Sequence, residues 1–110
     1  DLISYNASIS ALGKAAEWRA AAGLLGAMRG LRVEPDLISY NATISACDEG
    51  QQWQHGLELL RLVQVQYGLV PNGITYGAAI AACGRCRQWE HVLGLVEEMQ
   101  QRSLDPHAAV

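Results

Sequence analysis

An internal repeat of about 35 residues constrains this chain more than any other feature of its sequence. Residues 1–11 and 36–46 differ only at Ser8 and Thr43, and a looser third copy begins at Asn72. The second halves of the three units also align, because each contains a tryptophan followed by a leucine-rich stretch and a closing proline. Periods of this size are typical of solenoids, in which each unit packs against its neighbours.

The first half of each unit has the apolar spacing of an amphipathic helix, which we call helix A. In the first unit, Leu2, Tyr5, Ile9 and Leu12 lie three or four residues apart and form one apolar stripe. We expect helix A to end near Gly13 in this unit and near residues 48–50 in the second, where glycine and polar residues suit a helix C-terminus. The residues expected to cap helix A in the three units are Asp1, Asp36 and Asn72.

A second amphipathic helix, helix B, is predicted at residues 18–29, 53–66 and 89–101, before a glycine or serine and the closing proline. The chain is therefore predicted to be all-α, with three antiparallel helix pairs in one array. The expected units are residues 1–35, 36–71 and 72–106, and residues 107–110 begin a fourth. Since no pair buries its apolar face alone, the tryptophans at equivalent places are expected to fill the core.

Charge and hydropathy exclude several classes of protein. With a net charge of −3, the chain lacks the positive electrostatic field that is usual in proteins that bind nucleic acid mainly through its phosphates. No apolar run approaches the roughly 20 residues of a membrane span, and the N-terminus carries no recognisable targeting segment. The three cysteines are too few for a secreted disulfide framework, so a reducing compartment is expected.

A second line of residues on helix A lies one position beyond the core stripe. It reads Ile3, Asn6, Ser10 and Lys14 in the first unit and repeats in part in the other two. Asparagine inside a helix costs several tenths of a kcal/mol relative to alanine, so a contact must explain it. Its amide suits the Watson–Crick edge of an unstacked base, but it suits a bond to a neighbouring helix equally well.

The repeated Leu-Ile-Ser-Tyr-Asn-Ala string at residues 2–7 and 37–42, the leucine-rich helix B ending in Met28 or Met99, and Pro35 followed by Asp36 resemble the pentatricopeptide repeat family. The related tetratricopeptide pattern, with tryptophan in the first helix, is absent. The resemblance implies a right-handed α-solenoid that binds single-stranded RNA with one unit per base. It also implies a role in organellar RNA processing or stability, in a mitochondrion or plastid.

In that family, the residue after the helix A tyrosine and the residue after the closing proline select the base, and an aliphatic residue clamps it. The resemblance implies that Asn6 with Asp36 reads uridine and that Asn41 with Asn72 reads a pyrimidine, leaning to cytidine. Gly77 with His107 departs from the pattern, which leaves the third unit without a clear preference. The clamps would be Ile3, Ile38 and Ile74, and the phosphate contacts would be Lys14 and Arg85, whereas Glu49 does not match.

Metal and catalytic chemistry find little support in the sequence. Cys83 and Cys86 have CxxC spacing and His91 follows, but a structural zinc site needs four ligands. Redox use is also not favoured, because the motif should end a helix rather than begin one. No catalytic triad, carboxylate pair or phosphate loop is present, so we expect neither an enzyme nor a small-molecule substrate or cofactor. The rival to RNA binding is a scaffold for protein partners, since solenoids commonly present concave surfaces to peptides.

Overall fold

The computed structural model of the chain describes residues 1–65 and 69–102. In this part of the chain the only regular elements are six α-helices of 13 residues each: α1 Leu2–Lys14, α2 Trp18–Gly30, α3 Leu37–Glu49, α4 Trp53–Val65, α5 Gly73–Arg85 and α6 Trp89–Gln101. The prediction of an all-α array is confirmed. None of these described helices is long and apolar enough to cross a bilayer. The expected end of helix B at Gln66 and the start of a fourth unit at residues 107–110 lie outside the described residues.

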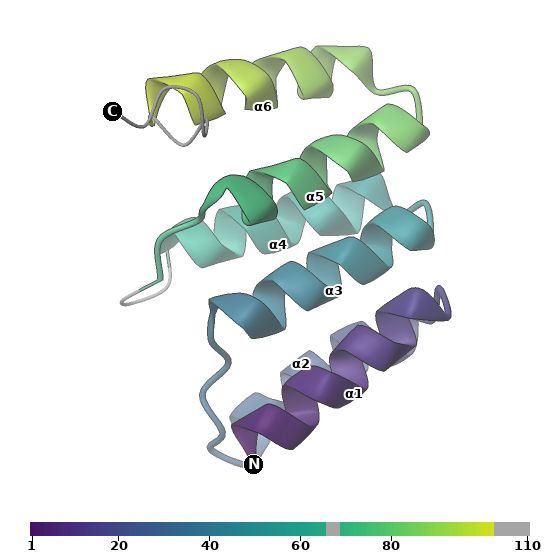
Figure 1. Cartoon of the computed structure of the whole chain (residues 1–110), viewed down its shortest axis with the longest axis vertical. Coiled ribbons are helices and arrows are strands. Elements are labelled where there is room, and N and C mark those ends of the chain that lie inside the picture. The colour runs from purple at the N-terminus through teal and green to yellow at the C-terminus, as the bar shows by residue number, and fades with distance from the viewer. Residues whose placement is uncertain (66–68, 103–110) are drawn as a thin grey trace.

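The helices form two layers. α1, α3 and α5 lie side by side as one layer, and helices α2 and α4 lie behind them (Figure 1). Each helix of the first layer contacts the next one along the stack, and α2 and α4 each pack between two helices of the first layer. This arrangement is the solenoid that the repeat predicts.

Small residues allow helices to pack tightly within the first layer and between the two layers. A Cβ added at Gly13 of α1 would lie 3.4 Å from Ala46 Cβ of α3, and one added at Gly56 of α4 would lie 3.7 Å from Ala82 Cβ of α5. In the second layer, the backbones of α2 and α4 do not approach each other closely within the described part of the chain. Long side chains, such as Trp18 and His55, fill the space between them.

The core lies between the layers. Its first cluster centres on fully buried side chains of α1, α2, α3 and α4, among them Ile9, Met28 and Val63. A second cluster continues it through Leu60 of α4 and Tyr76 of α5. The apolar stripes therefore join into one continuous core, in which no unit buries its own face alone.

The tryptophans are not equivalent, which corrects one expectation. Trp18 and Trp53 are half-buried, and the ring of each lies against a histidine of the next helix B: His55 at 4.5 Å and His91 at 4.9 Å between ring centroids. Trp89 is 60% exposed. It stands on α6, beyond which the described residues contain no helix that could cover it.

The predicted caps of helix A are confirmed. Each side chain accepts a hydrogen bond from a backbone amide in the first turn: Asp1 from Ser4, Asp36 from Ser39, and Asn72 from both Ile74 and Thr75. At α3 and α5 the hydroxyl at the third helical position also accepts from the backbone amide of the cap, which completes a capping box.

The residues that close the turns differ from those expected. The left-handed residue after the helix is not a glycine but Ala16, Arg32, Gln51 or Arg87, each with φ between 58° and 60°. Gly13 and Gly30 lie inside helices, and Gly50 precedes the left-handed residue with φ −86°. In the first turn, the amide of Glu17 donates to the carbonyl of Leu12 at 2.8 Å. Paired bonds of this kind hold a non-glycine residue in a conformation that costs about 1 kcal/mol or more.

Candidate nucleic-acid interface

Three aliphatic side chains are exposed at equivalent places on the first layer. Ile3, Ile38 and Ile74 are 81%, 63% and 68% exposed, and each is the second residue of its helix, α1, α3 or α5. Each lies two residues after its N-cap. Single exposed aliphatic residues are ordinary, but a row repeated along one face can pack against flat apolar ligands such as nucleobases.

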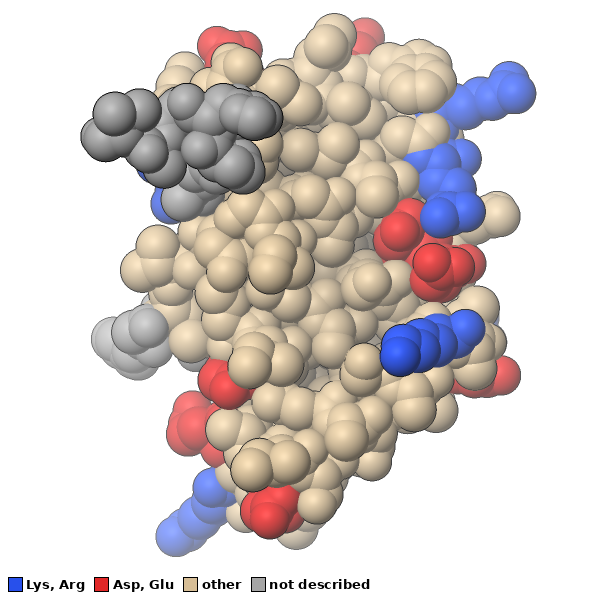
Figure 2. Space-filling view, in the orientation of Figure 1, with Lys and Arg blue, Asp and Glu red and all other residues tan. Residues whose placement is uncertain are grey.

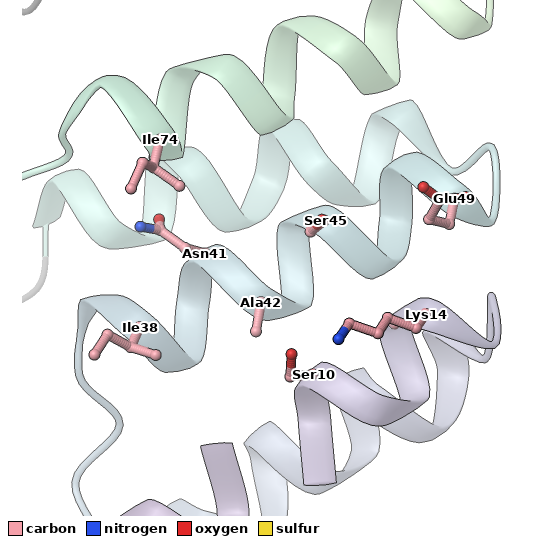
Figure 3. A pocket seen from close by; sticks show the side chains of 9 residues that line it. Ser10, Lys14, Ile38, Asn41, Ala42, Ser45, Glu49 and Ile74 are labelled. Atoms are coloured by element: carbon pink, nitrogen blue, oxygen red, sulfur yellow. The ribbon is translucent and has the colours of Figure 1, made fainter. Parts of the chain in front are cut away.

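An open groove of about 350 Å³ crosses this face between α1, α3 and α5. Ile38, Asn41 and Ile74 line one end of the groove, and Lys14 and Glu49 line the other. Figure 3 shows Asn41 pointing from α3 toward Ile74 of α5, with Ile38 one turn earlier on α3. The groove thus has an apolar end with one amide and a charged end at the C-termini of the helices.

The structure brings the first predicted pair of selectors together across 30 residues of chain. Asn6 Nδ2 donates to Asp36 Oδ1 at 3.1 Å, and the hydroxyl of Ser39 donates to Asn6 Oδ1 at 2.5 Å. Asp36 Oδ1 also accepts from the amide of Ser39, and it lies 3.0 Å from the same hydroxyl, whose single proton is shared between Asn6 and Asp36. The amide of Asn6 therefore does bond to the neighbouring helix, as one of the two interpretations expected, and this bond orients the pair.

The Asp36 carboxylate is held in its ionised form. Burial alone would raise its pKa, but the amide and hydroxyl of Ser39 and the amide of Asn6 donate to it and bring the pKa below the ordinary value of 3.8. At neutral pH this side chain is therefore an anion that only accepts hydrogen bonds.

The second pair meets in the same way but less tightly. Asn41 Nδ2 lies 3.5 Å from Asn72 Oδ1, which also accepts from the amides of Ile74 and Thr75. Asn41 Oδ1 is buried and accepts no hydrogen bond from the described residues. A buried acceptor left without a donor costs about 1–3 kcal/mol.

The third pair is only partly described. Gly77 is exposed on α5, and a Cβ added there would meet nothing within 4 Å. Its predicted partner His107 lies outside the described residues. The third unit thus presents the aliphatic clamp Ile74 beside an open position.

The two predicted phosphate contacts have different surroundings. Lys14 is exposed at the end of α1 and lines the groove. Arg85, at the end of α5, donates from Nε to Asp48 Oδ1 of α3 at 2.9 Å. This partner is not evident from the sequence, because two residues 37 positions apart meet only when the repeats stack.

Two further residues of the site were missed, Ser39 and Thr75. Each stands three residues after a selector, and its hydroxyl donates to Oδ1 of that selector at 3.0 Å. The sequence does contain a signal for these two residues, because an aspartate or asparagine followed three residues later by serine or threonine resembles a capping box. These hydroxyls hold one oxygen of each selector in place.

The cysteines form no evident metal or redox site. Among the described residues, no three histidine, cysteine, aspartate or glutamate side chains come together as metal ligands. Cys47 and Cys83 are buried, and burial raises the pKa of the Cys47 thiol to about 11. Cys86 is the C-cap of α5. A thiol with a raised pKa is mostly protonated at neutral pH and therefore a poor nucleophile.

Comparison with known families agrees with the repeat. The model described as "Pentatricopeptide repeat domain" matches residues 1–49, and the model described as "PPR repeat" matches residues 74–104. Together they cover the greater part of the chain, including helices α1 to α3 and α6 and nearly all of α5. No curated protein matches the sequence.

Proposed function

This chain belongs to the pentatricopeptide repeat family, whose members are helical-repeat proteins that typically bind RNA, and we propose that it binds single-stranded RNA through the grooved face of α1, α3 and α5. The hydrogen bonds within the two selector pairs carry this proposal. In each pair, capping engages one atom of the selector after the proline and leaves another atom for a base. The identity of that remaining atom sets the base.

In the first pair, Asp36 Oδ1 accepts all the hydrogen bonds that the described residues make to this carboxylate. Asp36 Oδ2 is left as an acceptor, and Asn6 Nδ2 retains one of its two N–H donors. Uracil presents an N3–H donor beside carbonyl acceptors, which complements this arrangement. The first unit is therefore a reader of keto bases.

In the second pair, Asn72 Oδ1 takes the capping bonds and leaves the Nδ2 amino group as a donor. Asn41 Oδ1 has no partner among the described residues, and it becomes the acceptor of the pair when the Asn41 side chain turns from its buried position toward the groove that it lines. Cytosine presents an amino donor beside the N3 acceptor, which complements both. The second unit is therefore a reader of amino bases.

The hydrogen bonds distinguish keto bases from amino bases, and the pyrimidine within each class is inferred from the family resemblance. On this basis the first unit binds uridine and the second binds cytidine. The third unit packs a base against Ile74 without distinguishing one base from another. Ile3 and Ile38 clamp the first two bases, and Lys14 contacts the phosphate backbone. A small count of basic contacts predicts modest affinity with a shallow salt dependence.

Two single substitutions test the base reading. Asp36→Asn keeps the capping oxygen but replaces the free acceptor with a donor, so both units should read cytidine. Asn72→Asp makes the opposite change, so both should read uridine. With fluorescent oligouridylate and oligocytidylate at low salt, we expect the ratio of the two affinities to move about tenfold toward C in the first variant and about tenfold toward U in the second.

The two variants serve as controls for each other, since both preserve the caps and change charge in opposite directions. Wild type should prefer an alternating UC oligonucleotide to either homopolymer. If the C-to-U ratio stays the same in both variants, the selectors do not read bases. If wild type binds none of the oligonucleotides at low salt, the rival function as a scaffold for protein partners is favoured instead.

We further propose that the RNA is organellar and that the chain belongs to a processing or stability factor of a mitochondrion or plastid. This assignment to an organelle rests only on the membership of the chain in the pentatricopeptide repeat family. Crosslinking the tagged protein in cells and sequencing the attached RNA tests it. Recovery of nuclear transcripts without mitochondrial or plastid RNA would contradict this part of the proposal.

A further inference from the structure

Charged side chains gather along one edge of the grooved face. Figure 2 shows acidic and basic groups along its right-hand edge, where α1, α3 and α5 end in Figure 1. The residues at these helix ends are Lys14 of α1, Asp48 and Glu49 of α3, and Arg85 of α5. We call these four residues the charged rim. Along the stack one basic residue is followed by two acidic residues and then by one basic residue, so the rim as a whole carries no net charge.

The two basic residues of the rim are not equally free. Arg85 Nε donates to Asp48 Oδ1 at 2.9 Å, and the side chains are 45% and 13% exposed. Arg85 therefore reaches back from α5 to the preceding repeat. Among the described residues Lys14 makes no ion pair.

Helix stability does not explain the acidic residues of the rim. Asp48 and Glu49 are the last two residues of α3, where the carbonyl end of the helix dipole disfavours anions. An ion pair with an exposed arginine contributes little to stability, so the bond to Arg85 at most offsets that cost. Removing Asp48 should consequently leave the fold intact.

We propose that Asp48 limits RNA affinity by occupying Arg85, the rim arginine placed to meet the phosphate backbone. This inference rests on the proposed function and deepens it. A carboxylate and a phosphate are both anions that pair with the same guanidinium donors. While Arg85 Nε bonds to Asp48, a phosphate is left with the two terminal amino groups of the guanidinium, whose charge the carboxylate partly offsets. The middle of the array therefore attracts the backbone less than its basic residues alone would allow.

The test compares two substitutions that remove the same charge. Asp48→Ala frees Arg85, whereas Glu97→Ala removes an exposed carboxylate of α6 that does not line the groove. We expect Asp48→Ala to bind an alternating UC oligonucleotide about three- to fivefold more tightly at low salt and Glu97→Ala less than twofold. The slope of log K against log salt should steepen by about 0.7 in Asp48→Ala, the value for one added phosphate contact on a single strand.

The same substitutions in an Arg85→Ala background complete a double-mutant cycle. There the gain from Asp48→Ala should fall to that of Glu97→Ala, because no arginine remains to be freed. Equal gains from Asp48→Ala and Glu97→Ala, or a gain that survives Arg85→Ala, would overturn the inference while RNA binding itself stands. Absence of binding by wild type and by Asp48→Ala would overturn both this inference and the proposed function.

Discussion

At the scale of single residues, the glycines differ in the space around them. A Cβ added at Gly50 would lie 2.5 Å from Trp18 Cδ1, near the rigid base of the indole, whereas one at Gly23 would meet nothing within 4 Å. We expect Gly50→Ala to lower the free energy of unfolding by about 1–3 kcal/mol through overpacking. Gly23→Ala in the exposed interior of α2 should raise it by about 0.5–1 kcal/mol. Urea unfolding of both variants measures the difference, and shifts of the same sign would contradict the Trp18 contact.

Residue identity alone located much of the candidate site, but it did not reveal which atoms are engaged. The resemblance named Asn6 and Asp36 as a pair, and the structure places them in hydrogen-bond contact. That Oδ1 rather than Oδ2 of Asp36 takes the bonds depends on the position of Ser39, which follows from the fold of the helix start. Arg85 shows the same limit, since its partner comes from another repeat.

At the scale of elements, the turns between helices depend on residues in the left-handed conformation. Arg32 and Arg87 are exposed and hold φ near 60° without being glycine. We expect Arg32→Gly and Arg87→Gly each to raise the free energy of unfolding by about 0.5–1 kcal/mol, because glycine adopts this conformation without strain. The two sites belong to different turns, so the gains should add.

A glycine placed inside a helix is the matched control for these turn variants. Ala20→Gly, at an exposed position within α2, should lower the free energy of unfolding by about 1 kcal/mol. Thermal or urea unfolding of the three variants gives the comparison. A loss of stability in Arg32→Gly and Arg87→Gly similar to that of Ala20→Gly would show that their backbones are not left-handed in solution.

The helices themselves were predicted closely from the sequence. Apolar spacing and capping residues located α1, α3 and α5, and the tryptophans marked the first residues of α2, α4 and α6. The turn residues were not predicted, because Ala16 and Gln51 have no intrinsic preference for a positive φ. Paired hydrogen bonds to the end of the helix impose that conformation after the helix has formed.

At the scale of the whole molecule, Glu98 ties three helices together. Its carboxylate accepts from Arg61 and Gln64 of α4 and from the hydroxyl of Tyr76 of α5, at 2.7 to 3.0 Å. Burial alone would raise the pKa of Glu98, but these hydrogen bonds outweigh it and lower the pKa below 4.5. The ionised form is thus favoured by folding, so its contribution is complete above pH 4.5 and is lost as the pH falls through the lowered pKa.

Replacing Glu98 should therefore change the acid stability of the array. Glu98→Gln is expected to be less stable than wild type at pH 7, and the difference should shrink as the pH falls below 4.5. Glu97→Gln, at an exposed neighbouring position, should follow wild type throughout. Urea unfolding at a series of pH values measures the difference in free energy of unfolding between wild type and Glu98→Gln. If that difference persists at low pH, packing rather than the charge of Glu98 holds the helices together.

The sequence by itself determined the array: its period, its six helices, its caps and the positions of its candidate base readers. These properties are local or recur at a fixed spacing, so a single chain displays them. Tertiary structure alone decided that Asp36 presents Oδ2 and Asn72 presents its amino group, that Trp89 is exposed, and that Arg85 is held by Asp48. Each of these depends on stacking, which brings residues about one repeat apart to within a few ångströms and so sets which polar atoms remain for a ligand.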